Sequence, residues 1–180
     1  MQIHFRSAKA MHGLLVAAIG FSSACGGGNR NLCDDIQTTK GPFGSQRIFS
    51  MRYNWGKIIQ LVEKDGKRFI VLMPVAAGMV RESIPPGAKV RLALGSSIVE
   101  LRVADETAPR HNATGSGIYT IWELRIPITA SQLSDFANKS LRGVSITVGA
   151  NEIESALDQD EMTEFTQGAR CMATPGGAIR

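Results

Sequence analysis

The residues with the clearest chemical potential are the three cysteines, Cys25, Cys33 and Cys171. A thiol can be acylated, can bind a metal as the thiolate, or can pair in a disulfide. An odd number of cysteines in an exported protein leaves one thiol for chemistry other than pairing. The surroundings of each cysteine therefore decide which chemistry is open to it.

Cys25 follows a segment with the three parts of a secretory signal. Residues 1–13 carry Arg6 and Lys9 without an acid, residues 14–21 are apolar, and residues 22–24 are small. This order predicts a signal peptide over residues 1–24. The apolar run is shorter than the ~20 residues that span a bilayer. A mitochondrial transit peptide is the alternative, but such peptides are amphipathic, whereas residues 14–21 are apolar on every side.

The stretch Ser22-Ser23-Ala24-Cys25 resembles the processing site of bacterial lipoproteins. The resemblance implies cleavage before Cys25, a lipid such as palmitate on Cys25, and a periplasm-facing protein anchored to the envelope at the outer membrane. Ordinary signal cleavage at the same bond, without acylation, is the alternative. With lipid on Cys25, Cys33 and Cys171 form an even pair in an oxidising compartment, so we expect a disulfide between them rather than two unrelated free thiols.

The residue patterns of the chain predict neither a catalytic residue nor a metal or other cofactor. His111 is the one histidine after residue 24, and it lies in a polar segment without a neighbouring nucleophile. Asp158-Gln159-Asp160 matches the start of a calcium loop, but Met162 occupies a ligand position, so these acids are expected to begin a helix. We favour a protein that is not an enzyme. The alternative is a secreted hydrolase that uses carboxylates from Glu100, Glu123 or Asp105-Glu106.

One surface is a candidate for binding a protein or cell-wall partner. Tyr119, Glu123 and Arg125 alternate with apolar residues and are expected on the outward side of one strand. An ordinary cross-strand cluster on an exposed sheet is the simpler interpretation. The nearby Ser116-Gly117-Ile118-Tyr119 resembles a short segment of periplasmic lysozyme-inhibitor lipoproteins. An inhibitor or immunity protein against a lytic enzyme or toxin is therefore the alternative to a structural or binding module.

Charge and length limit the partners and the number of domains. The chain has 20 basic and 16 acidic residues; without the two basic residues of the leader, 18 basic and 16 acidic residues leave a net charge of +2. No long basic run follows, so nucleic acid is not an expected partner. Residues 25–45 are expected to form a flexible tether and N-terminal segment, with a spacer at 26–31 and order from Cys33. Residues 46–180 are expected to form a single β-rich domain.

The elements that must position these residues are predicted from apolar periodicity. Strands are expected at 46–55, 57–63, 67–75, 89–94, 99–103, 118–128 and 144–148, with a hairpin turn at Asp65-Gly66 and a long polar loop over 104–117. Helices are expected at 129–139 and 158–172, each with a capping box. This pattern predicts a mainly β protein, an antiparallel β-sandwich or partly open barrel with two short helices, with an α+β fold as the alternative.

Overall fold

The computed structural model describes residues 32–41, 44–54 and 56–174. The signal peptide, Cys25 and the spacer at 26–31 were predicted for residues outside this described part. The described elements begin with the short 3-10 helix η1 (Leu32–Asp35). The strands are β1 (Gln37–Gly41), β2 (Gly44–Tyr53), β3 (Lys57–Lys64), β4 (Lys67–Met73), β5 (Val75–Ala77), β6 (Lys89–Leu94), β7 (Ser97–Arg102), β8 (Arg110–Thr114), β9 (Gly117–Ile121), β10 (Leu124–Pro127), β11 (Leu141–Val148) and β12 (Asn151–Ala156). The helices are α1 (Ala130–Asn138) and α2 (Gln159–Ala173).

The first sheet has five antiparallel strands in the order β1-β2-β3-β4-β10. Its inward side is built by strict alternation, because every second residue of β2 is buried from Phe49 to Tyr53. The predicted hairpin between β3 and β4 is confirmed: Asp65 and Gly66 both have positive φ, of 51° and 77°, as a type I′ turn requires. The interior strand β4 buries Ile70, Val71 and Leu72 in succession, as its continuous apolar run predicted.

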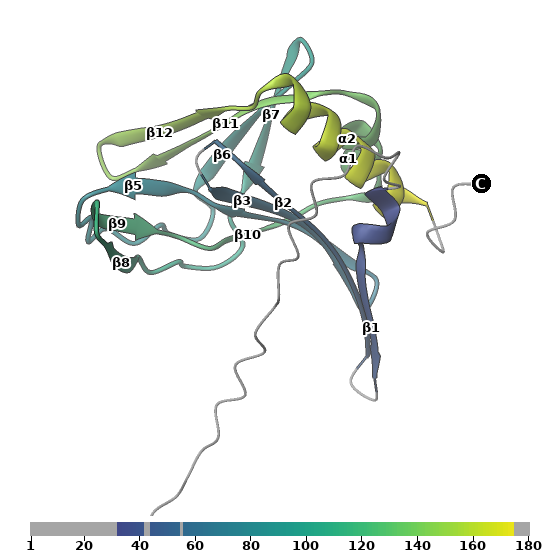
Figure 1. Ribbon diagram of the computed structural model, residues 1–180, viewed down its shortest axis with the longest axis horizontal. Helices are drawn as coiled ribbons and strands as arrows, with labels where there is room; N and C mark the ends of the chain where they lie inside the picture. Colours follow the sequence, from purple (N-terminus) through teal and green to yellow (C-terminus); the bar gives the residue numbers. More distant parts are fainter. Residues whose placement is uncertain (1–31, 42–43, 55, 175–180) are drawn as a thin grey trace, which may run out of the picture.

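The second sheet has four antiparallel strands in the order β12-β11-β6-β7. The predicted hairpin of residues 89–103 forms β6 and β7, and Gly95 in its turn has a φ of 56°. Figure 1 shows this sheet above the five-stranded one, with both helices at one end of the molecule and a three-stranded sheet, β5-β9-β8, at the other.

The predicted strand over 118–128 is wrong in one respect, because it is two strands of different sheets. β9 pairs with β5 and β8, whereas β10 pairs with β4. Trp122 lies at the break and is fully buried; its indole Nε1 donates to the carbonyl of Glu82 at 3.1 Å. Burial of this large side chain turns the chain from one sheet to the next while the apolar alternation continues through the turn.

The expected polar loop over 104–117 is also corrected, because it contains β8. All five residues of β8 are exposed, so the strand has no apolar alternation by which a sequence could reveal it. It is held by main-chain pairing with β9. The short strands β1, β5 and β12 were not predicted either; β1 and β12 pair with the adjacent strands β2 and β11, whereas β5 pairs with the distant β9.

Both predicted helices are confirmed, with capping boxes at Thr129 with Gln132 and at Asp158 with Glu161. Phe136 of α1 and Phe165 of α2 pack with their ring centroids 5.8 Å apart. α2 lies directly on β2 at Gly168, where a Cβ would come within 2.3 Å of the Phe49 ring. The helix therefore approaches the sheet as closely as it does because position 168 lacks a side chain.

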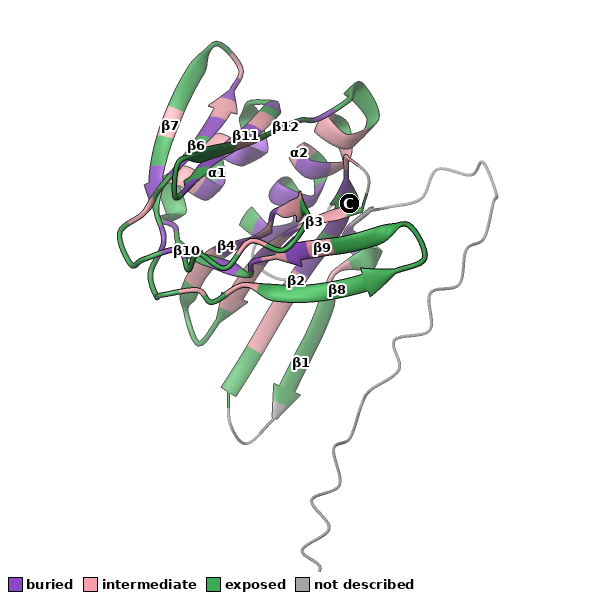
Figure 2. Ribbon diagram, turned by 90° about the vertical axis from the view of Figure 1, so that its left-hand side faces the viewer, coloured by how far each residue is buried: buried purple, intermediate pink, exposed green. Residues whose placement is uncertain are grey.

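One hydrophobic core joins the two larger sheets and both helices, which confirms the predicted mainly β sandwich or open barrel with short helices. In Figure 2 buried residues alternate with more exposed ones along the strands and helices of this core, whereas β8 is exposed throughout. The buried residues of this core lie between Phe49 and Met172, and Ile36 packs against it. Among the described residues, no helix is long and apolar enough to cross a membrane.

Candidate functional site

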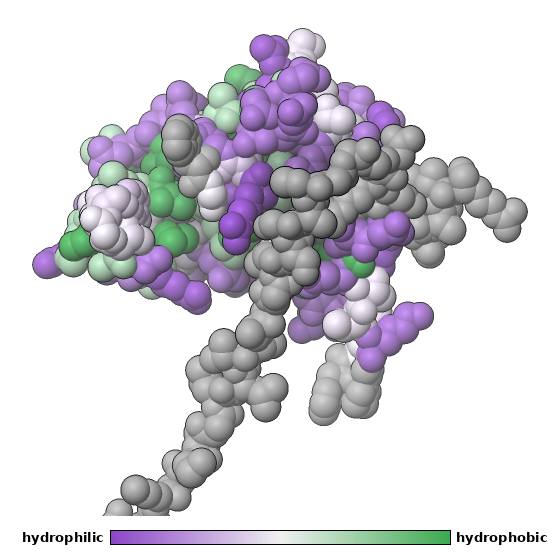
Figure 3. All heavy atoms as spheres, in the orientation of Figure 1, coloured by the Kyte–Doolittle hydropathy of each residue, from purple (hydrophilic) through white to green (hydrophobic). Residues whose placement is uncertain are grey.

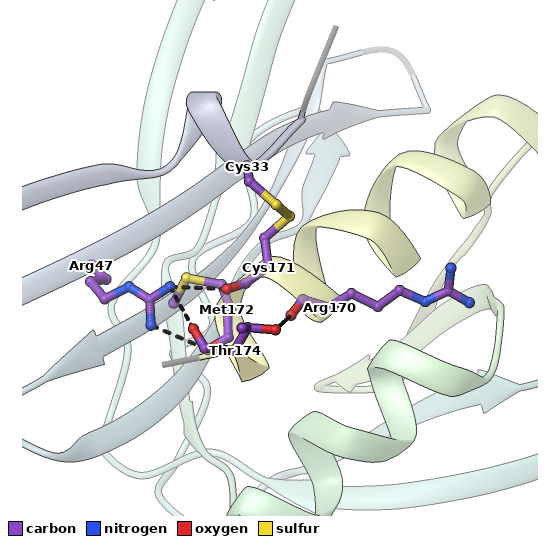
Figure 4. The surroundings of a disulfide bond; sticks show 6 residues. All are labelled: Cys33, Arg47, Arg170, Cys171, Met172 and Thr174. Atoms are coloured by element: carbon purple, nitrogen blue, oxygen red, sulfur yellow. Dashed lines mark hydrogen bonds between the residues drawn. A yellow bond between two sulfur atoms is a disulfide. The ribbon is translucent and has the colours of Figure 1, made fainter. Parts of the chain in front are cut away.

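The predicted pairing of Cys33 with Cys171 is seen in the structure as a disulfide (Figure 4). The Cα atoms are 5.3 Å apart and the two residues are separated by 138 positions. The bond joins η1, at the start of the folded chain, to the last turn of α2. Both cysteine side chains are buried, so the bond is protected from solvent.

Arg47 of β2 supports the same end of α2 (Figure 4). Its guanidinium donates to the carbonyl oxygen of Cys171 at 2.9 Å and to a carboxylate oxygen of Glu63 at 3.3 Å. The last carbonyls of a helix have no partner within the helix and carry partial negative charge, so a cation stabilises them. The disulfide and Arg47 together fix the end of α2 to the five-stranded sheet.

The predicted binding residues Tyr119, Glu123 and Arg125 lie on different parts of the fold. Tyr119 is on β9 and its hydroxyl lies 3.2 Å from the hydroxyl of Ser116. Glu123 lies between β9 and β10, 3.8 Å from the Arg110 guanidinium. The Arg125 guanidinium of β10 lies over the Phe69 ring, 5.5 Å from its centroid. The structure therefore gives each of them a separate local partner, and their joint role in binding stays a prediction.

The residues considered for catalysis have ordinary structural partners. Glu100 pairs with Lys89 at 3.1 Å and with Arg102 at 3.4 Å on the outside of the four-stranded sheet. His111 Nδ1 lies 3.2 Å from the Thr120 hydroxyl. Within the described residues, His, Cys, Asp and Glu form no group of three that could hold a metal ion.

Three ionisable groups with shifted pKa values gather where the β2–β3 turn meets β12 and α2. Burial, opposed by a hydrogen bond with Ser155, raises the pKa of Tyr53 to about 12, and burial lowers the pKa of Lys57. The Lys57 ammonium donates to the Ser155 hydroxyl. Burial, together with the charges of Asp35 and Glu161, raises the pKa of Glu164.

A serine bonded to a lysine of lowered pKa is a pair that can act in acyl transfer. Here the pair is used to fasten the β2–β3 turn. Ser155 is only 7% exposed, and the adjacent Asn54 donates its main-chain N–H to Glu161 at 2.7 Å. Asn54 has a φ of 36°, a conformation that asparagine tolerates better than most residues. We assign this cluster to the satisfaction of buried polar groups.

A groove of about 350 Å³ lies on the outward side of the four-stranded sheet. Small residues form its floor: Ala93, Gly143 and Ala156. Ile98 borders it and is 73% exposed. This site was not predicted from the sequence, in which the small residues at outward positions of three strands were the available signal.

Charged residues line one side of the groove. Arg91 lies 3.6 Å from Glu152, whose carboxylate also accepts a 2.7 Å hydrogen bond from the Ser145 hydroxyl. A Cβ at Gly143 would lie 3.1 Å from the carbonyl oxygen of Ser155, so glycine keeps the floor low at this point. An open apolar floor beside fixed polar groups is suited to an extended segment of a partner.

We compared the chain with protein-family models, curated proteins and solved structures. No match was found in any of the three. The groove, the disulfide and the sequence before residue 32 are therefore the basis for a functional proposal.

Outside the groove, two large apolar side chains of the described residues are exposed. Met79 and Ile118 are 54% and 43% exposed at the end of the three-stranded sheet. Figure 3 shows apolar residues at that end of the molecule, whereas most of the rest of the visible face is hydrophilic.

Proposed function

We propose that the protein is an exported lipoprotein, anchored to the outer membrane through lipid on Cys25. Its β-domain binds a protein or cell-wall partner through the groove on the four-stranded sheet and is not an enzyme. The observation that carries the proposal is the Cys33–Cys171 disulfide, because it uses both cysteines of the folded domain and leaves Cys25 for acylation.

Export is supported by the disulfide and by the leader together. Structural disulfides persist in the periplasm and outside the cell, and they are rare in the cytosol. The leader of residues 1–24 has the charged, apolar and small parts of an export signal. Two independent features of the chain thus agree on the same compartment.

Binding without catalysis is supported by the form of the groove. Its floor consists of Ala93, Gly143 and Ala156, which offer space and apolar contact. The charged groups beside it are engaged in an ion pair between Arg91 and Glu152. Such a surface can hold a partner's segment by shape and by exchange of polar contacts.

The lipid anchor is tested by labelling. The full chain is expressed in a Gram-negative bacterial host grown with radiolabelled palmitate, beside the variants Cys25→Ala and Cys33→Ala. We expect label on the wild type and on Cys33→Ala, and none on Cys25→Ala. A processed but unlabelled wild-type protein would refute the anchor.

The groove is tested by site-specific photo-crosslinking in the envelope. A crosslinking amino acid replaces Ile98 beside the groove or, as the matched control, Ser50 on the outside of the five-stranded sheet. We expect a discrete crosslinked partner from position 98 and not from position 50. Equal crosslinking from both positions would argue against the groove. Recovery of a lytic enzyme or toxin would identify the protein as an inhibitor or immunity protein.

A further inference from the structure

The outward side of the five-stranded sheet is a second, chemically distinct surface. Strand pairing places Ile48, Val62, Phe69 and Pro127 in one row across four strands. Most apolar side chains of this surface are half-buried, which means that part of each remains open to solvent. We call this surface the basic sheet face; its apolar members are Ile48, Ile58, Val62, Phe69, Val71, Met73 and Pro127.

The charged residues among the outward positions of β2, β3, β4 and β10 are all basic. They are Arg52, Lys64, Lys67 and Arg125, and all four are exposed. The outward side of the four-stranded sheet differs, because it carries acidic as well as basic residues, such as Glu152 beside Arg91. The two outer faces of the domain thus have different electrostatic character.

The arrangement of two of these cations does not serve the stability of the hairpin. Lys64 and Lys67 stand directly opposite each other at the end of β3 and β4. Like charges directly opposite each other in an antiparallel pair are destabilising. The closest acid in sequence, Asp65, accepts the main-chain N–H of Ser45 at 3.2 Å. Attraction to an anionic partner outside the domain would account for Lys64 and Lys67 at the end of this hairpin.

The proposed anchor brings a membrane within reach of this face. Cys25 and Cys33 are eight positions apart, which limits that span to about 28 Å when fully extended. From Cys33 the chain passes through η1 directly into β1, the edge strand of the same sheet. Cys33 is bonded to α2, which packs on the inward side of this sheet, so the described chain enters the domain at the β1 edge and not on the basic sheet face itself. A span of about 28 Å from that edge still allows the domain to turn the basic sheet face toward the membrane.

From this juxtaposition of an apolar sheet surface, an all-basic set of charges and a short tether, we propose that the basic sheet face docks on the surface of a bilayer that contains anionic phospholipid. The inference rests on the proposed function, which supplies the membrane. Cations attract the headgroups, and the apolar residues between them contact the boundary with the acyl chains. Docking would turn the groove of the four-stranded sheet away from the membrane and toward a partner.

The test uses the unacylated chain of residues 26–180, so that no lipid anchor contributes. Co-sedimentation is measured with vesicles of phosphatidylcholine alone and with vesicles in which about a third of the lipid is phosphatidylglycerol. The variant Lys64→Gln/Lys67→Gln is compared with the matched control Lys89→Gln/Arg91→Gln, which loses the same charge from the other outer face. A third variant, Ile48→Ser, tests the apolar contribution, with circular dichroism as the check on folding.

We expect the wild type to bind the anionic vesicles and not the neutral ones, with binding weakened by salt. Each cation near an anionic surface contributes a factor of about five, so Lys64→Gln/Lys67→Gln should weaken binding about 25-fold. The control should stay within about twofold of the wild type, and Ile48→Ser should bind several-fold more weakly. The melting temperature of Lys64→Gln/Lys67→Gln should be unchanged or higher, which a structural role of the two lysines would not allow.

Two results would overturn the inference. One is equal sedimentation of the wild type with neutral and anionic vesicles, and the other is equal loss of binding in the two double variants. Palmitate labelling of Cys25 is independent of both results. Labelled Cys25 without vesicle binding would therefore refute only the docking face, and vesicle binding without label would refute only the anchor.

Discussion

Replacement of Gly168 by alanine should destabilise the protein, although the same change usually stabilises a helix. In an exposed helix, alanine is favoured over glycine by about 1 kcal/mol. At position 168, however, the added Cβ would lie 2.3 to 2.4 Å from three carbons of the Phe49 ring. The ring is 1% exposed, so it has no open space into which to move.

The expected size follows from the two opposing effects. Overpacking of a buried site costs about 1–3 kcal/mol, and the closeness of three ring carbons places Gly168→Ala at the upper end. Subtraction of the gain in helix propensity leaves a net loss of about 2 kcal/mol in the free energy of unfolding. For a domain of this size the melting temperature should fall by roughly 4–8 °C.

The assay is urea unfolding of residues 26–180, followed by circular dichroism. Phe49→Leu removes the ring carbons that the new Cβ would meet. The double variant Gly168→Ala/Phe49→Leu should therefore be more stable, by about 1 kcal/mol or more, than the sum of the single effects allows. Gln167→Ala, an exposed neighbour, is the control and should change stability by less than about 0.5 kcal/mol. A stabilising effect of Gly168→Ala would refute the close packing of α2 on β2.

Three further predictions concern the same end of the fold. The double variant Cys33→Ala/Cys171→Ala should lose about 5 kcal/mol in urea unfolding, because the 138-residue separation gives a large loop-closure entropy; a loss below about 1 kcal/mol would contradict that origin. Arg47→Met should lower the free energy of unfolding by about 2 kcal/mol, since charged hydrogen bonds to the end of α2 and to Glu63 are lost; an unchanged urea midpoint would contradict it. The pKa of Glu164 is higher in the folded than in the unfolded state, so the protonated carboxyl favours the folded state at low pH. This contribution to stability is lost as pH rises through the folded pKa. Glu164→Gln should therefore flatten the decline of the melting temperature as pH rises through the folded pKa of Glu164, and a parallel decline in the variant would contradict this assignment.

The parts of the fold that the sequence predicted well are those with local causes. The capping boxes at Thr129 and Asp158 lie within four residues of chain, and both helices begin where those boxes predict. Asp65-Gly66 specifies its hairpin because the required positive φ angles are intrinsic to those residues. Alternation likewise identified the inward sides of the long strands, since period two is a local property of extended chain.

The parts that the sequence did not predict lack a signal in the order of their own apolar residues. The change of sheet at Trp122 follows from burial of its ring and from the acceptor at Glu82, forty residues earlier. β8 has no buried residue and exists through its pairing with β9. Tyr119 and Arg125 were expected on one strand surface, but the break between β9 and β10 puts them on different sheets.

The sequence by itself determined that Cys25, Cys33 and Cys171 could serve as one lipid site and one disulfide, because residue type, count and the leader are readable along the chain. Only the tertiary structure decided that Cys33 and Cys171 meet, and that small residues of separate strands form one groove. Likewise, the order of the strands alone places the outward cations of β2, β3, β4 and β10 on one side of the five-stranded sheet. A surface is set by which strands become neighbours, and that choice is made by the whole core.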